Sequence, residues 1–268
     1  MNARLFGSIS VALVLAVALI LAGCGGGAGG GGEQGGGGGG EQITVASDIA
    51  YPPFEFEKNG EPVGFDIDLM REIGKRAGFT PDFKNVTFDG IIPGLGNNLY
   101  DASISAMTIT EERAQKVDFS DPYFNADQSL TVRRDSPIKS VSDVGDATVG
   151  MQLGTTGALK AEELKEQGKI TGEIRTFDTI PEAFAALENG QVDAVINDFP
   201  VSAYEAETGD GSLEVVQTIP TGEQYGIAFP KDSELVEPVN EALQEIKEDG
   251  TYAKLYEEWF GQKPQEIP

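Results

Sequence analysis

An arginine follows a short polar segment that we predict to join a strand to a helix. The segment is Ser105-Ala-Met-Thr108-Ile-Thr110-Glu-Glu-Arg113. A threonine followed by two acidic residues is typical of a helix N-terminus, so we place a strand end at Ser105 and a helix start at Thr110. Arg113 then lies in the first turn beside Thr108, where its planar guanidinium suits a carboxylate. The alternative is a surface arginine paired with a neighbouring glutamate, and the residue types alone favour that alternative.

A loop of small residues forms a second candidate site for an anion. In Val149-Gly-Met-Gln152-Leu-Gly154-Thr155-Thr156-Gly157, a predicted strand turns through glycine and threonine into a predicted helix. Such a turn offers unpaired backbone N–H groups and two hydroxyls to a negative group. The loop lacks the lysine and the spacing of a Walker loop, so a nucleotide phosphate is not indicated. The alternative is that Thr155 or Thr156 only caps the helix.

A carboxylate and two aromatic residues complete the set. Asp198 follows the apolar run of residues 192–196, and a carboxylate at a strand end inside a cleft would attract an ammonium group. It could also cap the next helix, and the two roles are compatible. Two prolines predict a rigid loop in Asp48-Ile-Ala-Tyr51-Pro-Pro-Phe54, and Tyr51 could wall a pocket with Phe88. Either aromatic side chain could equally belong to the core.

Strands and helices that could position these groups alternate along the chain. Short apolar runs rich in β-branched residues are typical of strands, and their alternation with helices predicts an α/β fold with largely parallel sheets. We predict strands at residues 43–46, 83–86, 102–104, 147–151, 174–177 and 192–196. We predict helices at residues 66–78, 90–95, 156–167, 180–188 and 252–260, the first of them ending at a glycine and the last packing its Trp259 and Phe260 into a core.

A faint internal repeat suggests two similar lobes. The pattern Thr-Phe-Asp, Ile-Pro, Asp-Ala occurs between residues 87 and 102 and again between residues 176 and 194. In each copy a predicted strand ends in polar residues, which are Ser103 and Ser105 in the first copy and Asn197 and Asp198 in the second. Ligands of open α/β sheets gather at the carboxyl ends of strands, so the repeat indicates a cleft between two lobes. The alternative is that any two strand–helix–strand units look alike at this level.

The composition excludes several kinds of chemistry. The chain has 19 Lys plus Arg against 44 Asp plus Glu, a net charge of −25, no histidine and one cysteine, Cys24. There is accordingly no Ser-His-Asp or Cys-His catalysis, no imidazole metal site, no internal disulfide and no cysteine zinc cluster. We expect no metal, no cofactor and no catalytic residue. A chain this acidic repels phosphate backbones, so we expect no nucleic-acid partner.

The N-terminus predicts secretion and lipid attachment. Arg4, an apolar run over residues 5–21 and small residues before Cys24 describe a secretory signal. The tetrapeptide Leu21-Ala-Gly-Cys24 resembles the bacterial lipobox, in which the cysteine is acylated and becomes the mature N-terminus. The alternative is a transmembrane anchor, because about 17 apolar residues just span a bilayer. We therefore assign residues 1–23 to a lipoprotein signal peptide and residues 24–42 to the lipidated Cys24 and a glycine-rich flexible tether.

Several motifs occur in the order found in one known family. They are Gly64-Phe-Asp-Ile-Asp-Leu69, Asp89-Gly-Ile-Ile-Pro93, Met107 to Arg113 followed by Val117-Asp-Phe-Ser-Asp121, Gln224-Tyr-Gly-Ile-Ala-Phe-Pro230, and Asp249-Gly-Thr-Tyr252 with Trp259-Phe-Gly261. With them, residues 43–264 resemble the extracytoplasmic solute-binding proteins of amino-acid ABC importers, the family-3 group with the type II periplasmic-binding-protein fold. The resemblance implies two lobes joined by two crossing strands, which we place at residues 129–134 and 224–229. Lobe 1 would comprise residues 43–129 and 224–264, and lobe 2 residues 130–223.

The resemblance also implies a role for each candidate residue. Arg113 would clamp the α-carboxylate of an amino acid, helped by Thr108 and by the helix start at Thr155 and Thr156. Asp198 would take the α-ammonium group together with the carbonyl near Ala106, beside Ser105. Tyr51 and Phe88 would enclose the ligand side chain, and closure of the lobes would remove water from both charged pairs.

Specificity follows from three further positions that the resemblance assigns to side-chain selection. These are Asp48, Gln152 and Asn197. The motifs as a whole are most similar to those of glutamine-binding proteins. Close relatives of that type, however, carry a basic residue in place of Gln152 and a histidine in place of Asn197. Without those positive groups, Asp48 favours a cationic side chain, so we expect arginine or lysine, with glutamine as the alternative.

Two other classes of function remain as alternatives. A dehydratase on the same fold would need a general acid or base in the cleft, and Asp198 or Asp48 could serve, although an Arg–Asp clamp for a zwitterion explains both more simply. A sensor ectodomain would need transmembrane and signalling segments after the lobes. We expect instead a binding protein, not an enzyme, that is anchored by lipid on the outer face of the cell membrane, acts as a monomer, binds a free amino acid and serves ABC permease subunits.

Overall fold

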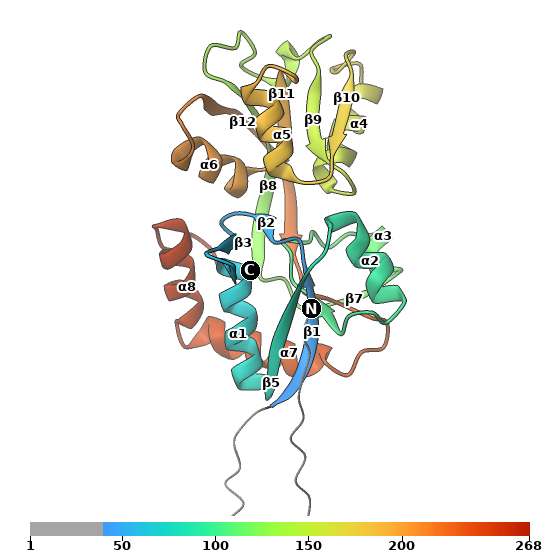
Figure 1. The fold of residues 1–268 in the computed structure, drawn as a ribbon, viewed down its shortest axis with the longest axis vertical. Coiled ribbons are helices and arrows are strands. Elements are labelled where there is room, and N and C mark those ends of the chain that lie inside the picture. The colour runs from blue at the N-terminus through green and yellow to red at the C-terminus, as the bar shows by residue number, and fades with distance from the viewer. Residues whose placement is uncertain (1–39) are drawn as a thin grey trace, which may run out of the picture. The chain divides into compact units, whose positions relative to one another are not determined.

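A computed structural model describes residues 40–268 of the chain (Figure 1). The predicted signal peptide, Cys24 and nearly all of the predicted tether lie outside the described residues. Among the residues that are described, no helix is long and apolar enough to cross a membrane. The first strand begins at Glu41, two residues earlier than predicted.

Two five-stranded sheets organise the described part of the chain. The first has the order β5-β1-β6-β13-β7 and the second the order β10-β9-β11-β8-β12. Figure 1 shows them in two lobes, one above the other, with β8 and β12 running between them. We call the part built on the first sheet the first lobe and the part built on the second sheet the second lobe.

The first lobe uses both ends of the described chain. Its sheet contains β1 (Glu41–Ser47), β5 (Phe79–Asn85), β6 (Ala102–Ser103), β7 (Asp118–Phe119) and β13 (Ala228–Phe229). Its helices are α1 (Phe65–Ala77), α2 (Phe88–Gly96), α3 (Glu111–Ala114), α7 (Val236–Glu248) and α8 (Thr251–Phe260). A three-stranded antiparallel sheet that the sequence did not predict adds β2 (Ala50–Tyr51), β3 (Glu55–Lys58) and β4 (Glu61–Val63).

The second lobe lies between these parts in the sequence. Its strands are β8 (Phe124–Arg133), β9 (Val149–Gln152), β10 (Ile174–Phe177), β11 (Ala194–Asp198) and β12 (Leu213–Tyr225). Its helices are α4 (Thr156–Glu166), α5 (Ile180–Glu188) and α6 (Phe199–Thr208), with a short 3-10 turn η1 at Val141–Asp143.

The sheets are mixed, whereas the sequence predicted largely parallel ones. In the first sheet β1 is parallel to β5 and β6, and β13 is antiparallel to β6 and β7. In the second, β9 is parallel to β10 and β11, and β8 is antiparallel to β11 and β12. In the second sheet the antiparallel pairs involve the crossing strand β8, and in the first they involve β13, which follows the return crossing; the βα alternation reveals neither.

The crossing strands are longer than predicted, and their positions differ from the prediction. β8 pairs with β12 from the Arg133–Leu213 pair to the Phe124–Tyr225 pair, with irregularities in β12. The predicted crossing at residues 224–229 includes only the last two residues of β12 and all of β13. The apolar residues around Gly226 are therefore core of the first lobe, and the crossing itself lies earlier in the sequence.

Buried aromatic residues hold the first lobe together beneath the site. The Phe54 ring contacts the rings of Phe65 and Phe124 edge to face, with centroids 6.1 and 4.8 Å apart. Tyr225 stacks on Phe124 at 5.7 Å. Trp259 and Phe260 are only partly buried and pack against this core from α8. This cluster fixes the ends of both crossing strands against α1 and α8.

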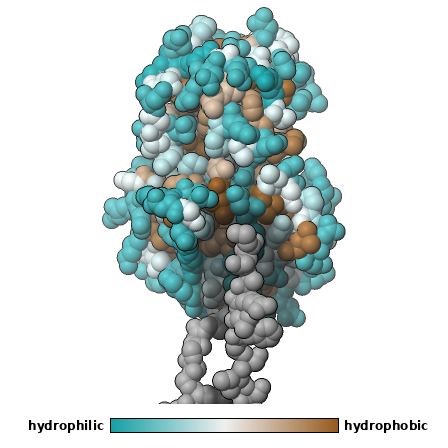
Figure 2. Space-filling model, in the orientation of Figure 1, coloured by the Kyte–Doolittle hydropathy of each residue, from teal (hydrophilic) through white to brown (hydrophobic). Residues whose placement is uncertain are grey.

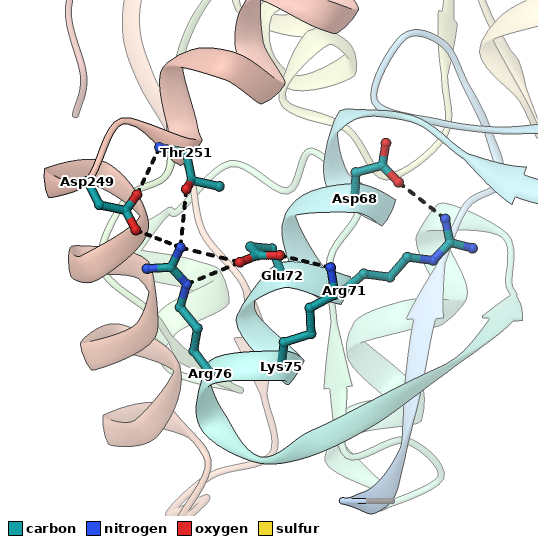
Figure 3. Close-up of polar contacts among 7 residues, drawn as sticks. All are labelled: Asp68, Arg71, Glu72, Lys75, Arg76, Asp249 and Thr251. Carbon is teal, nitrogen blue, oxygen red and sulfur yellow. Dashed lines mark hydrogen bonds and ion pairs between the residues drawn. The ribbon is translucent and has the colours of Figure 1, made fainter. Parts of the chain in front are cut away.

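A polar network at the surface ties α1 to the last two helices. Arg76 of α1 bonds the carboxylates of Glu72 at 3.3 Å and Asp249 at 2.8 Å, and also donates to the Thr251 hydroxyl at 3.2 Å (Figure 3). These charges are partly exposed, so we assign the network an orienting role rather than a large contribution to stability. The rest of the visible surface is mainly hydrophilic (Figure 2), as the acidic composition requires.

Candidate functional site

A narrow pocket lies where the facing edges of the two lobes meet. All the residues assigned to the site from the sequence line the pocket, except Asn197. The Asn197 side chain instead contacts the hydroxyl of Tyr51, which is a lining residue. Glu55, which the sequence analysis did not single out, lines it as well. The lining residues are Asp48, Tyr51, Glu55, Phe88, Ser105, Ala106, Thr108, Arg113, Gln152, Thr155, Thr156 and Asp198.

Arg113 is buried in the pocket and bridges the two lobes. Its guanidinium donates to the carbonyl of Thr108 at 2.7 Å and to the carbonyl of Gly154 in the second lobe at 3.0 Å. Only 8% of the residue is exposed, and its guanidinium lies over the Phe88 ring, 5.2 Å from the centroid. Burial lowers the pKa of Arg113 from its usual value. The alternative of a solvated surface arginine is therefore wrong.

Arg113 owes this position to the short helix that the sequence predicted. The side chain of Thr110 caps α3 by accepting a hydrogen bond of 3.1 Å from the Arg113 backbone N–H. In the second lobe, Thr155 caps α4 in the same way and accepts a bond of 3.1 Å from Ala158. The predicted capping role of Thr155 is thus confirmed, and it places the N-terminus of α4 at the pocket.

The hydroxyls of Thr108 and Thr156 face each other across the pocket at 3.3 Å. Both also contact Glu223 of the crossing strand β12, Thr108 at 3.1 Å and Thr156 at 2.8 Å. Gln128 of the other crossing strand donates to Glu223 at 3.0 Å. Two lobes and both crossing strands therefore meet in one polar network next to Arg113.

Asp198 occupies the N-cap position of α6 without making a side-chain capping bond. Its carboxylate instead accepts hydrogen bonds from the hydroxyls of Tyr51 at 2.8 Å and Tyr225 at 2.5 Å, and a further one from the Gln128 amide. Burial, with the charge of Glu223 as a second cause, raises its pKa to about 6 even though these donors oppose the shift. The carboxylate therefore gains from any additional positive partner.

Tyr51 connects the first lobe to two residues of β11. Besides its bond to Asp198, its hydroxyl lies 3.0 Å from the side-chain oxygen of Asn197. The ring is 7% exposed and lines the pocket, so its wall position agrees with the sequence analysis. The segment from Asp48 to Phe54 is not a loop throughout, because Ala50 and Tyr51 form β2.

Asp48 and Gln152 form the polar contact at another part of the wall. Gln152 donates to the Asp48 carboxylate at 2.5 Å and to the carbonyl of Asp178 at 3.0 Å. The pKa of Asp48 is raised to about 6 by burial, with repulsion from Asp89 adding to the shift and the Gln152 bond opposing it. This contact again joins the first lobe to the second.

Glu55 brings a second acid to the same side of the pocket. It is fully buried and accepts a bond of 2.9 Å from the Ser105 hydroxyl, which in turn accepts one of 2.9 Å from the Asp48 backbone N–H. Burial, with the charge of Asp66 next to it, raises the pKa of Glu55 well above its usual value. Arg113 is the one Lys or Arg among the lining residues, so the described pocket is rich in acid.

The sequence analysis missed Glu55, Gln128, Glu223 and Tyr225. Glu55 belongs to an alternating aromatic–acid run, Phe54-Glu-Phe-Glu57, in which an acid normally faces solvent. Gln128 and Glu223 each lie one residue before a predicted crossing segment, and Tyr225 lies inside the second one. For Glu223 and Tyr225 the motif starting at Gln224 was the one available signal. Among the described residues, no group of three or more His, Cys, Asp or Glu side chains has the arrangement of a metal site.

Comparison with known proteins identifies relatives across nearly all of the described chain. The arginine-binding protein 1 of an Escherichia coli ABC transporter is 36% identical, covering 83% of this chain and 92% of its own length. The glutamine-binding protein GlnH of a Bacillus subtilis ABC transporter is 37% identical over 78% of this chain and 76% of its own.

Solved structures of similar proteins have the same fold. The arginine-, lysine-, histidine-binding protein ArtJ from Geobacillus stearothermophilus superposes with a TM-score of 0.78 at 38% identity, covering 84% of this chain and 97% of that protein. The family profile of bacterial extracellular solute-binding proteins, family 3, matches residues 43–262. The chain therefore belongs to the family-3 bacterial extracellular solute-binding proteins and has their two-lobed fold.

Proposed function

We propose that this chain is the receptor of an ABC importer for a basic amino acid, arginine or lysine. The observation that carries the proposal is the pair of buried acids, Asp48 and Glu55, in a pocket whose single lining cation is Arg113. Burial disfavours the ionised form of these two carboxyl groups, and a cationic ligand side chain would stabilise that form. An acidic ligand side chain would instead be repelled by them. The relatives named for arginine, lysine and histidine support this choice.

The two charges common to all amino acids have their own partners. Arg113, the N-terminus of α4 and the hydroxyls of Thr108 and Thr156 would hold the α-carboxylate, as charge-assisted donors gathered on one side of the pocket. Asp198 would hold the α-ammonium group with the Ala106 carbonyl. Opposite charges at the two positions fix the orientation of the zwitterion.

The side chain would then point towards the acids. Tyr51 and Phe88 would enclose its aliphatic part, with Asp48, Gln152 and Glu55 around its charged end. Asn197 would act indirectly, by holding the Tyr51 hydroxyl. Closure of the lobes would remove water from the ion pairs between ligand and protein, which strengthens their attraction. It would also raise the energetic cost of leaving any charge in the pocket unpaired.

The proposed receptor is anchored to the membrane by its N-terminus. Lipid attachment at Cys24 and the glycine-rich tether would keep a monomer at the outer face of the membrane, where it can deliver the amino acid to permease subunits. Treatment of cells with an inhibitor of lipoprotein processing tests the anchor. The uncleaved precursor should then accumulate, and a Cys24→Ser chain should be released or remain unprocessed.

Glutamine is the alternative ligand, favoured by the likeness to GlnH and by the Gln152–Asp48 contact, which can accept a neutral polar group. A thermal-shift panel of the natural amino acids separates the two proposals. Arginine or lysine at about 100 times Kd should stabilise the chain by about 2.7 kcal/mol, with glutamine giving less at equal concentration. A larger thermal shift with glutamine than with arginine or lysine would make glutamine the proposed ligand. Shifts with acidic or aliphatic amino acids alone would contradict both the basic ligand and glutamine.

We propose binding without chemical turnover. A dehydratase would convert the bound molecule, so the ligand recovered from a saturated sample distinguishes the classes. Arginine or lysine should be recovered unchanged after prolonged incubation. A product in proportion to time and protein concentration would favour the enzyme.

A further inference from the structure

Two buried carboxyl groups lie against each other beneath the pocket. Glu55 of β3 and Asp66 of α1 are both fully buried. The Asp66 backbone N–H donates to the carbonyl of Phe54 at 2.9 Å, so the start of the helix lies directly against the residue before Glu55. Gly64 permits this approach, because a Cβ there would lie 2.0 Å from the Phe54 oxygen.

Each carboxyl group has one satisfied and one unsatisfied oxygen. Glu55 Oε1 accepts from Ser105 at 2.9 Å, and Asp66 Oδ2 accepts from the Ala106 N–H at 2.8 Å and the Tyr123 hydroxyl at 2.7 Å. Glu55 Oε2 and Asp66 Oδ1 have no hydrogen-bond partner among the described residues. The two groups are within hydrogen-bonding reach of each other, so a single proton between them would satisfy both remaining oxygens.

The groups around the pair are acidic or neutral, apart from Arg113 in the same pocket, whose guanidinium is bonded to the carbonyls of Thr108 and Gly154. Asp48 approaches from the segment after β1, Tyr51 from β2, Tyr123 from the segment before β8, and Asp198 faces the same pocket from β11. No Lys or Arg side chain of the described chain is hydrogen-bonded to either carboxyl group. Two negative charges here would have neither solvent nor a hydrogen-bonded cation, which is the situation in which one of two carboxylates retains its proton. Burial accordingly raises the pKa of Asp66 to about 6, and that of Glu55 well above its usual value.

We propose that Glu55 and Asp66 share one proton, and that a cationic ligand side chain takes its place and expels it. Before binding, the Glu55 carboxyl O–H donates to the Asp66 carboxylate. On binding, that O–H bond breaks and the proton passes to solvent. The Glu55 carboxylate, which lines the pocket, then faces the guanidinium or ammonium group with the Asp66 carboxylate behind it, and the local net charge is unchanged. The inference rests on the proposed basic ligand and adds a pH dependence to its recognition.

The sign of the pH effect follows from this exchange. Protons released on binding mean that the affinity for arginine rises with pH until the free pair has already lost its proton. Citrulline has nearly the same shape as arginine and the same α-groups but no side-chain charge. Its binding should leave the shared proton in place, so its affinity should rise less steeply over the same pH range.

Calorimetry of the full chain in detergent tests the exchange. L-arginine and L-citrulline are titrated at one pH between 6 and 7, in phosphate and in Bis-Tris, whose ionisation enthalpies differ. Arginine should release about one proton more than citrulline does. In Glu55→Gln that excess should fall sharply, whereas Glu57→Gln, a matched change in an exposed acid of the same strand β3, should retain it.

An infrared difference spectrum gives a second readout that does not require the variants to bind. The carbonyl band of protonated carboxyl groups should weaken when arginine is added to the native chain. Before any ligand is added, the band should already be weaker in Glu55→Gln than in Glu57→Gln. Equal proton release for both ligands, or a band that arginine binding leaves undiminished, would overturn the shared proton while leaving the basic ligand in place. Failure of arginine to bind at any pH would overturn the proposed ligand itself.

Discussion

The Thr156 hydroxyl donates a hydrogen bond of 2.8 Å to the Glu223 carboxylate, so the start of α4 in the second lobe is tied to the crossing strand β12. Thr108 of the first lobe contacts the same carboxylate oxygen at 3.1 Å. A hydroxyl has one proton to donate. Neither threonine can therefore donate to Glu223 and to a ligand carboxylate at once, and Glu223 is a negative group beside the proposed anion clamp.

Removal of this competing charge should strengthen ligand binding. Glu223→Gln keeps the shape of the side chain but no longer repels the α-carboxylate, and it releases the threonine hydroxyls more readily. We expect a Kd for arginine about tenfold lower, a gain of ~1.4 kcal/mol. Glu214→Gln is the matched control, because Glu214 lies on the same strand and pairs with Lys139 at the surface. Weaker binding in Glu223→Gln would show that the glutamate supports the clamp.

Arg113 should be required in a manner that lysine cannot replace. Its guanidinium bonds carbonyls of both lobes, and a lysine ammonium has no planar fork with which to do this and also bind a carboxylate. We expect Arg113→Ala to weaken arginine binding by at least about 100-fold and Arg113→Lys to restore only part of it. Calorimetry measures both losses. Arg175→Ala, in which a partly exposed arginine over Phe177 is removed, should bind normally. Full affinity in Arg113→Ala would eliminate the clamp.

Without ligand, the chain should be more stable near pH 5 than near pH 7. The pKa values of Asp48, Asp66 and Asp198 are raised by burial to about 6 from an ordinary 3.8. Between these values the folded state binds more protons than the unfolded state, so stability increases as the pH falls. Urea unfolding at the two pH values measures this difference, and Asp48→Asn should reduce it. Saturation with arginine should reduce it further, since the bound cation replaces protons. Equal or lower stability at pH 5 would contradict the assignment.

The sequence predicted those elements whose boundaries depend on local signals. The helix at residues 66–78 was placed within a residue of α1, because its apolar period ends at Gly78, which adopts the left-handed conformation expected of a helix cap. The strand at 174–177 and the helix at 180–188 coincide with β10 and α5. Elements of two or three residues, such as β2 and β7, carry too few side chains for a pattern to form.

The candidate site was predicted unevenly for a related reason. Arg113 and Asp198 were assigned to the site from the resemblance to a known family, and the two residues line the same pocket in the structure. Residue type alone had favoured a surface position for Arg113. Glu55 was missed because its burial is set by a long-range contact between β3 and the start of α1, which no local pattern encodes. Glu223 was missed because it lies one residue before the predicted crossing at 224–229, and its contact with the pocket depends on how β12 passes between the lobes.

The approach that buries Glu55 depends on Gly64 and can be tested there. Gly64 has φ of 134° and would bring a Cβ to 2.0 Å from the Phe54 carbonyl oxygen, so an alanine must push β3 away from α1. We expect Gly64→Ala to lower the free energy of unfolding by at least about 2 kcal/mol, from strain and lost contacts together. Gly60→Ala provides the matched control. It also has a positive φ, 83°, but its Cβ would meet nothing within 4 Å, so it should cost only about 1 kcal/mol. Equal losses in the two variants would show that the backbone conformation, rather than the contact with Phe54, makes glycine necessary at residue 64.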